Sequence, residues 1–207
     1  MRRFVVTGCP RSGTMYASKL FGALGVRMAH EDVFGHRQGM GGAPQWQDYE
    51  GDASWLAVTQ LPLDDVVVLH QVRHPLEFVR SIVGFAKPGF LSDERAKYPA
   101  PRILRSHAPE IYEAGTHAER GAVMWRSLNA KAERHAAITY RVEDVDVPLL
   151  LRLCSLIELD VTEAQATQAV EGLSRTTNRA GRDESVQWEE IEPIVGEAAA
   201  HYGYHAP

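Results

Sequence analysis

Cysteine is scarce in this chain of 207 residues, and long hydrophobic runs are missing from it. The two cysteines, Cys9 and Cys154, stand far apart without CxxC spacing, so neither a disulfide framework nor a thiolate zinc site is indicated. No stretch approaches the roughly 20 apolar residues of a membrane span, and the apolar run before Gly8 is too short for a signal peptide. We therefore expect a cytoplasmic protein without a membrane span.

A surplus of positive charge is missing as well. Lys and Arg number 22 against 27 Asp and Glu, which gives a formal net charge of −5 at pH 7. Nucleic-acid binding depends on clustered basic side chains that neutralise phosphates. The balance therefore argues against a nucleic-acid partner and leaves room only for a local basic site that binds a small anion. The length fits one domain over residues 1–207 with long loops.

Strands and helices alternate along the sequence. The pattern predicts strands at 4–7, 66–69 and 137–140, and a short strand at 26–31. Helices are predicted after residue 13 and from Pro75, and further helices at 122–134, 147–157, 162–173 and 193–201. Segments 34–54 and 86–118 are predicted to be loops with short helices at most. Such alternation predicts an α/β fold with a doubly wound, mostly parallel sheet flanked by helices, whose ligand lies beyond the carboxyl ends of the strands.

Gly8 and Gly13 frame a loop between the first strand and the first helix. Backbone N–H groups and the positive end of the helix dipole converge on an anion in such a loop. A nucleotide triphosphatase has a lysine directly after the second glycine. Here Thr14 takes that place, and the cation of the loop is Arg11. The loop thus lacks the lysine for a terminal phosphate and has no clear magnesium partner, which points away from ATP.

Residues 10–16 resemble the 5′-phosphosulfate loop of the sulfotransferase family, which reads Pro-Lys/Arg-Ser-Gly-Thr-Thr and then an aromatic or apolar residue. The resemblance implies a P-loop-like α/β fold and the sulfuryl donor 3′-phosphoadenosine-5′-phosphosulfate. It also implies that Arg11 contacts the bridging or sulfuryl oxygens and that Tyr16 lies near the adenine. Met15 replaces the usual second Thr, so only its backbone N–H is left for the phosphate. The implied donor-binding residues here are Pro10, Arg11, Ser12, Gly13, Thr14, Met15 and Tyr16.

Two further segments resemble the same family. Arg73, with Pro75 two positions later and Ser81 eight positions later, is similar to the family's 3′-phosphate motif. Arginine offers phosphate a bidentate, charge-assisted grip, and a serine hydroxyl adds a neutral donor. The basic segment 175–182 is similar to the family's C-terminal segment that closes over the 3′-phosphate, which implies roles for Arg179 and Arg182. A solvated basic loop remains an equally good interpretation of that segment.

Sulfuryl transfer by in-line displacement requires positioning, a cation for the leaving oxygen and a base for the acceptor hydroxyl, but no metal. Arg11 is the expected cation. Several sulfotransferases carry a catalytic Glu after the first helix, which implies Glu31 as the base, with His30 as the alternative because a neutral imidazole also suits pH 7. The acceptor is a small molecule, carbohydrate or lipid that the sequence does not identify. A P-loop small-molecule phosphotransferase and a nucleotide-binding module that has lost catalysis remain as competing interpretations.

Overall fold

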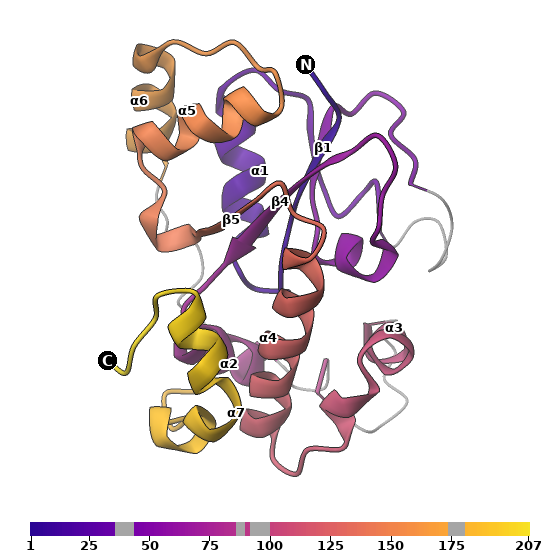
Figure 1. Cartoon of the computed structure of the whole chain (residues 1–207), viewed down its shortest axis with the longest axis vertical. Coiled ribbons are helices and arrows are strands. Elements are labelled where there is room, and N and C mark those ends of the chain that lie inside the picture. The colour runs from indigo at the N-terminus through magenta and orange to yellow at the C-terminus, as the bar shows by residue number, and fades with distance from the viewer. Residues whose placement is uncertain (36–43, 86–89, 92–99, 174–180) are drawn as a thin grey trace. The chain divides into compact units, whose positions relative to one another are not determined.

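The computed structural model describes residues 1–35, 44–85, 90–91, 100–173 and 181–207 (Figure 1). The chain divides into two compact units. Unit 1 comprises Met1–Val72 and Lys131–Thr177, and unit 2 comprises Arg73–Ala130 and Asn178–Pro207. The single domain over 1–207 stays a prediction. Among the described residues, no helix combines the length and the apolar character that a bilayer crossing requires.

Unit 1 contains a five-stranded, all-parallel sheet in the order β2-β3-β1-β4-β5. Its strands are β1 (Phe4–Thr7), β2 (Met28–His30), β3 (Gly51–Ala53), β4 (Val67–Val72) and β5 (Ile138–Arg141). The helices of this unit are α1 (Thr14–Ala23), α5 (Val147–Leu156) and α6 (Glu163–Glu171), with 3-10 helices at Trp55–Gln60 and Val142–Asp144. The parallel sheet and its flanking helices confirm the predicted α/β fold class.

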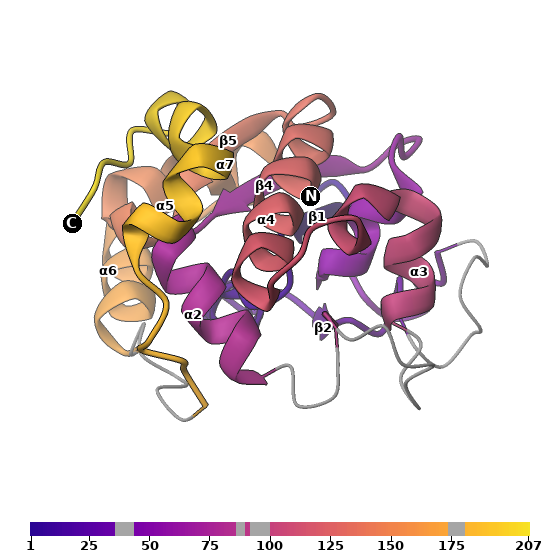
Figure 2. The same cartoon turned by 90° about the horizontal axis from the view of Figure 1, so that it is seen from below.

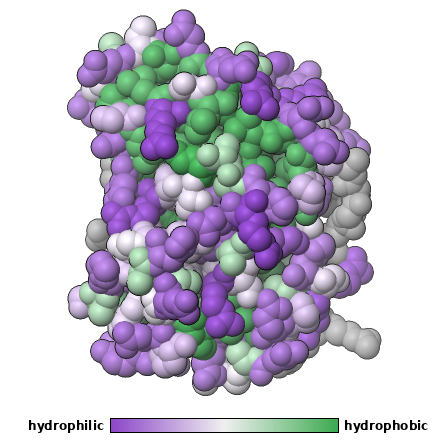
Figure 3. Space-filling view, viewed as in Figure 1, coloured by the Kyte–Doolittle hydropathy of each residue, from purple (hydrophilic) through white to green (hydrophobic). Residues whose placement is uncertain are grey.

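The centre of the sheet is apolar because β1 and β4 are fully buried. Side chains from both strands form one core with α1, α5 and α6, and this core includes Phe4, Phe21, Leu69 and Leu153. On α5, Leu149, Leu151 and Leu156 are only half-buried, and Figure 3 shows apolar side chains gathered over this helix. One apolar core thus joins the centre of the sheet to α1, α5 and α6.

The strand order creates a switch point between β1 and β4. After β1 the chain leads through α1 to β2 on one side of the sheet, whereas after β4 it leads on to β5 on the other side. Thr7 lies opposite His70 where these neighbours end. In open parallel sheets, ligands bind beyond the carboxyl ends of the strands at such a point. The loop 8–13 starts there.

Unit 2 is helical in its described part. Its helices are α2 (Pro75–Phe85), α3 (Ala100–His107), α4 (His117–Glu133) up to residue 130, and α7 (Trp188–His201), with a 3-10 helix at Pro109–Tyr112. Figures 1 and 2 show α2, α4 and α7 side by side. A Cβ on Gly121 of α4 would lie 3.2 Å from Val79 and from Ile82 of α2. The rings of Trp125 and Tyr202 meet edge to face at 5.7 Å.

Two expectations from the sequence are wrong in detail. The segment 34–54 contains a strand, β3, which pairs with β1 and β2. The last helix begins at Trp188 rather than at Pro193, which lies inside α7. Proline favours a first helical position, and inside a helix it removes one backbone hydrogen bond, yet α7 accommodates Pro193 beyond its first turn. The other predicted strands and helices are confirmed, with ends shifted by a few residues.

Candidate functional site

The loop between β1 and α1 has an unusual backbone. Arg11 has φ 67° and Gly13 has φ 96°, so both lie in the left-handed region. The N–H of Ser12 donates to the carbonyl oxygen of Cys9 at 3.2 Å and closes the turn. Glycine adopts this conformation at no cost, whereas a residue such as Arg11 is strained in it. The loop thus holds its arginine in a defined and locally unfavourable conformation.

Gly8 allows the loop to lie directly against β4. A Cβ at Gly8 would lie 2.2 Å from the carbonyl oxygen of Gln71, and this oxygen belongs to strand backbone that cannot move away. A Cβ at Gly13 would lie 3.1 Å from Nε2 of Gln71. Close approach to Gln71 therefore requires glycine at position 8, whereas at position 13 the positive φ favours glycine and the contact with Gln71 is only tight.

A buried hydrogen-bond chain holds the loop from below. Nε2 of Gln71 donates to the carbonyl oxygen of Ser12 at 2.7 Å, and the hydroxyl of Tyr140 on β5 donates to Oε1 of Gln71 at 3.0 Å. Buried polar groups that are fully satisfied fix a unique geometry. Sequence reasoning missed Gln71 and Tyr140; the one available signal is the pair of polar residues His70 and Gln71 near the end of a strand whose other residues are apolar.

The same loop leaves polar groups for a ligand. Ser12 is fully buried, and its hydroxyl has no hydrogen-bond partner among the described residues. Helix α1 has Gly13 as its N-cap without a side-chain cap, and no acidic residue occupies its first turn. An unmet buried hydroxyl costs about 1–3 kcal/mol, and free N–H groups at a helix start attract anions. An oxyanion bound by this loop would accept hydrogen bonds both from the Ser12 hydroxyl and from the N–H groups at the start of α1.

The remaining residues of the motif differ in exposure. Met15 is 42% exposed, so a side chain at this position can reach a ligand. Tyr16 is 2% exposed and belongs to the apolar core of unit 1. Its hydroxyl has no partner within the described part of the chain. Tyr16 thus has a clear packing role, and its contact with an adenine stays a prediction.

A second group of polar residues follows β2 and β3. His30 ends β2, and its Nε2 is hydrogen-bonded to Oγ1 of Thr14 at 3.2 Å. The N–H of Glu31 donates to Oδ1 of Asp52 on β3 at 2.9 Å, and the N–H of Phe34 donates to Oδ2 at 3.4 Å. The structure therefore brings the two candidate bases, His30 and Glu31, to the same strand end, with His30 tied to the first residue of α1.

Asp52 fixes the backbone turn that carries Glu31. Glu31 has φ 62°. A Cβ on Gly35 would lie 1.3 Å from the carbonyl oxygen of Glu31, so the turn is tight and needs glycine there. The carboxylate of Asp52, which is completely buried, closes this turn by accepting two of its N–H groups. Sequence reasoning missed Asp52 because it lies in a segment predicted to be a loop.

Burial changes the proton affinity of these groups. Burial, followed by the negative charges of Asp52 and Asp32, raises the pKa of Glu31 to about 7. Burial also raises the pKa of Asp52 to about 6, although backbone hydrogen bonds oppose this change. The pKa of His30 is lowered by burial, against the opposing charge of Asp32. Glu31 thus titrates near neutral pH, as a general base requires.

Unit 2 joins Arg73 and Arg182, two residues far apart in sequence, on one carboxylate. Nη2 of Arg182 lies 2.6 Å from Oε1 of Glu77, and Nη2 of Arg73 lies 3.6 Å from Oε2 of the same group. Ser81 is buried one helical turn after Glu77 on α2. Arg179 lies outside the described residues. Sequence reasoning missed Glu77, since only the fold shows that it meets Arg182.

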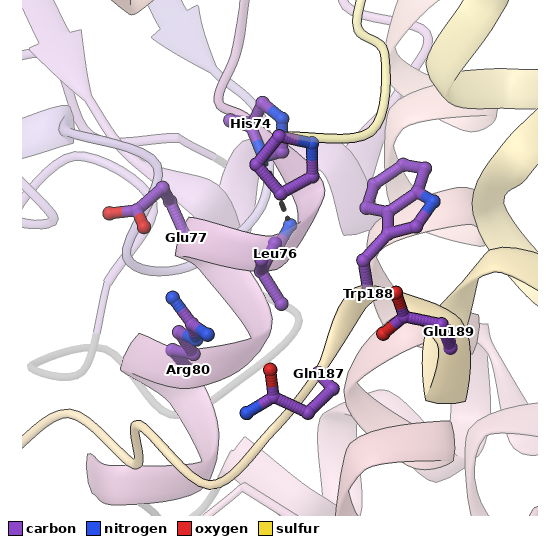
Figure 4. Close-up of a pocket in the computed structure, with 8 residues that line it drawn as sticks. His74, Leu76, Glu77, Arg80, Gln187, Trp188 and Glu189 are labelled. Carbon is purple, nitrogen blue, oxygen red and sulfur yellow. Dashed lines mark hydrogen bonds between the residues drawn. The ribbon is translucent and has the colours of Figure 1, made fainter.

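A cavity of about 290 Å³ lies beside this cluster in unit 2 and is lined by His74, Leu76, Glu77, Arg80, Gln187, Trp188, Glu189 and Pro207. Figure 4 shows His74 and Trp188 on one side and Glu77 with its carboxylate pointing away from both rings. Nδ1 of His74 accepts from the N–H of Leu76 at 3.3 Å, and its Nε2 is bonded to the carbonyl oxygen of His205 at 3.2 Å. His74 is therefore a structural residue that ties the C-terminal segment to α2.

No protein-family model and no curated protein matches the sequence. Among solved structures, the chain is similar to a sulfotransferase from Alicyclobacillus acidocaldarius, with 14% identical residues and a TM-score of 0.43. The alignment covers 99% of this chain and 97% of that chain. A likeness with so low a TM-score carries no argument of its own, so the α/β assignment rests on the parallel sheet and its helices.

Proposed function

We propose that this chain is a sulfotransferase that uses 3′-phosphoadenosine-5′-phosphosulfate as its donor. The observation that carries the proposal is the loop after β1. It combines a strained Arg11, a buried Ser12 hydroxyl with no partner among the described residues, and an uncapped helix start, without a lysine after Gly13. This set of groups suits a phosphate joined to one further anionic group better than the terminal phosphate of a nucleoside triphosphate.

The 3′-phosphate of the donor is assigned to Arg73, Ser81 and Arg182 in unit 2, with Arg179 assigned on sequence alone. Support comes from the shared carboxylate of Glu77, because two guanidinium groups that already hold one anion are arranged for an anion of similar size. The 5′-phosphosulfate is assigned to residues 10–16 in unit 1. The two assignments rest on different residues, so separate variants test them.

In the proposed reaction, the hydroxyl oxygen of the acceptor forms a bond to sulfur while the bond between sulfur and the bridging phosphate oxygen breaks. The hydroxyl proton passes to the carboxylate of Glu31, and adenosine 3′,5′-bisphosphate leaves. Arg11 stabilises the negative charge that develops on the bridging oxygen. The acceptor is a small molecule, carbohydrate or lipid with a hydroxyl or, as second choice, an amine. No step of this scheme uses a metal ion.

Glu31 is preferred to His30 as the base because of its proton affinity. Its carboxyl has a pKa of about 7, so a large share is ionised at neutral pH while it still binds a proton well. Burial lowers the pKa of His30, so its imidazole binds a proton less well, and its Nε2 is hydrogen-bonded with Oγ1 of Thr14. Asp52 holds the backbone of Glu31 and acts as a positioning residue.

A screen of hydroxyl and amine acceptors with sulfur-labelled donor tests the activity. We expect one acceptor class to take up label, and we expect Glu31→Gln to lower kcat by about 100-fold or more, since a positioned base contributes about that much. His30→Gln is the matched variant on the neighbouring residue and should lose less. If no acceptor takes up label while the bisphosphate still binds, the chain is a nucleotide-binding module without catalysis, which the absent hydroxyl at Met15 would suit.

A further inference from the structure

We propose that Glu77 is an internal anion that occupies the place of the 3′-phosphate in the ligand-free protein and makes the site selective for a doubly charged phosphate monoester. The inference rests on the proposed function, because it takes Arg73 and Arg182 as ligands of that phosphate. It adds a residue that opposes binding and thereby sets specificity.

The two oxygens of the Glu77 carboxylate are shared between two guanidinium groups. Oε1 lies 2.6 Å from Nη2 of Arg182, and Oε2 lies 3.6 Å from Nη2 of Arg73. The side chains of Arg182 and Arg73 are only 19% and 24% exposed, whereas that of Glu77 is 35% exposed. The arginines are thus the more enclosed partners. The carboxylate has access to solvent and can leave them.

Backbone packing, rather than a flexible side-chain contact, brings Arg182 to Glu77. A Cβ on Gly84 of α2 would lie 1.8 Å from the carbonyl oxygen of Gly181, so the two backbones touch. One turn earlier on the helix, the carbonyl oxygen of Arg80 accepts a hydrogen bond from the N–H of Asp183 at 2.9 Å. These contacts fix the backbone on either side of residue 182 against the second half of α2, and the Arg182 side chain reaches Glu77 from there. The site is therefore built before any ligand arrives.

The ion pairs around Glu77 favour an anion of higher charge than its carboxylate. Glu184 pairs with Nε of Arg182 at 3.1 Å and with Nη1 of Arg80 at 3.3 Å. Together with Arg73 and Glu77 the group holds three arginines and two glutamates, so one formal positive charge remains. Within this group of ion pairs the arginines outnumber the glutamates.

Displacement of Glu77 depends on the charge of the ligand. A phosphate monoester carries about −1.5 to −2 charge at pH 7, whereas a diester or a sulfate ester carries −1. A monoanion that replaces Glu77 exchanges one single charge for another and gains little. A dianion cancels the remaining positive charge as well. The site should therefore distinguish a free 3′-phosphate from an esterified one.

Calorimetric titration with adenosine 3′,5′-bisphosphate tests the proposal. Glu77→Gln should bind this ligand about 3- to 10-fold more tightly than the wild type, which is the range expected for loss of one partly exposed competing charge. Adenosine 5′-phosphate, which has no 3′-phosphate, should bind both proteins equally. Glu77→Asp keeps the helix-start charge but withdraws the carboxylate, and it should also bind the bisphosphate more tightly.

Glu190→Gln is the matched control, since Glu190 is an exposed glutamate in the first turn of another helix of unit 2, α7. It should leave both affinities unchanged. The wild type should bind the bisphosphate at least about 10-fold more tightly than its 3′-methyl ester. In Glu77→Gln the ratio of these two affinities should be smaller. Equal or weaker bisphosphate binding by Glu77→Gln and Glu77→Asp would overturn the role of Glu77 alone. Absence of bisphosphate binding by every protein would overturn the proposed function together with it.

Discussion

Gln71 donates a hydrogen bond of 2.7 Å from its side-chain amide to the carbonyl oxygen of Ser12, and so ties the end of β4 to the loop after β1. The backbone oxygen of the same residue lies where a Cβ of Gly8 would be. One strand residue thus supports the loop at two points. Tyr140 fixes the amide of Gln71 in turn.

Gln71→Leu should disturb the conformation of loop 8–13 more than it disturbs the packing of the hydrophobic core. The leucine fills a similar volume but leaves the carbonyl of Ser12 and the hydroxyl of Tyr140 without partners, at a cost of about 1–3 kcal/mol for each unmet group. We expect about a 10-fold loss of affinity for adenosine 3′,5′-bisphosphate with folding retained, measured by calorimetry and circular dichroism. Gln168→Leu, on the exposed face of α6, is the control and should bind normally. Normal binding by Gln71→Leu would show that the loop does not need this support.

Two glycine substitutions test the effect of backbone contact at Gly8 separately from the effect of helix propensity at Gly22. Gly8→Ala places a methyl group against strand backbone at 2.2 Å. Overpacking of this kind costs about 1–3 kcal/mol or more. A Cβ on Gly22 of α1, in contrast, meets nothing within 4 Å, so Gly22→Ala should stabilise by about 0.5–1 kcal/mol. Urea unfolding measures both, and equal effects would contradict the described packing of Gly8.

The elevated pKa values of Glu31 and Asp52 predict a characteristic dependence of stability on pH. An unfolded Glu has a pKa of about 4.3, whereas that of Glu31 is about 7 in the folded state. Over this interval the folded protein binds more protons, so the contribution of Glu31 to stability is present at low pH and is lost as pH rises through 7. Asp52 acts in the same direction up to about pH 6.

Urea unfolding of the wild type and of Glu31→Gln between pH 4.5 and 7.5 tests this dependence. The free energy of unfolding should fall more steeply with rising pH in the wild type than in the variant. His30, whose pKa is lowered, contributes with the opposite sign. Taking the difference between the two proteins removes its contribution as far as the two sites are independent. Parallel curves would show that Glu31 titrates at its ordinary pKa.

Asp52 should affect the pH dependence of the activity as well as the geometry of the turn at Glu31. Since its negative charge helps to raise the pKa of Glu31, Asp52→Asn should move the acid limb of the kcat/KM profile from about pH 7 to lower pH. A lower kcat from the altered turn is expected beside this shift. The shift distinguishes an electrostatic role from a merely structural one. An unchanged acid limb would show that Glu31 is not the general base, or that the charge of Asp52 does not affect its pKa.

The sequence predicts those parts of the fold that local patterns determine. The strand at 4–7, the loop with Arg11 and the helix start at Thr14 are adjacent in the chain, and apolar periodicity marks each element. Strand β3, by contrast, consists of Gly51, Asp52 and Ala53, residues of low strand propensity. It is a strand only because β1 and β2 pair with it on either side, which no local pattern reveals.

The residues of the candidate site also divide into those that a local sequence pattern reveals and those that only the fold reveals. Arg11, Arg73 and the glycines are found from motifs, whereas Gln71, Asp52 and Glu77 act through partners far away in the chain. Their roles appear only when the sheet and the packing against α2 are known. Pro193 misleads for a related reason. Its preference for a first helical position is real, but α7 already begins at Trp188, and Trp188 and Ile191 on its first turns are buried.

The central claim is that this chain binds an adenosine phosphorylated on both its 3′ and 5′ oxygens. Side-by-side calorimetry of adenosine 3′,5′-bisphosphate and of ATP with magnesium tests it most directly, with Arg11→Ala and Arg73→Ala as variants that report on the two phosphates separately. We expect the bisphosphate to bind at least about 10-fold more tightly than ATP with magnesium and each variant to lose about 10-fold or more of that affinity. Tighter binding of ATP with magnesium, or no heat with the bisphosphate, would contradict the claim.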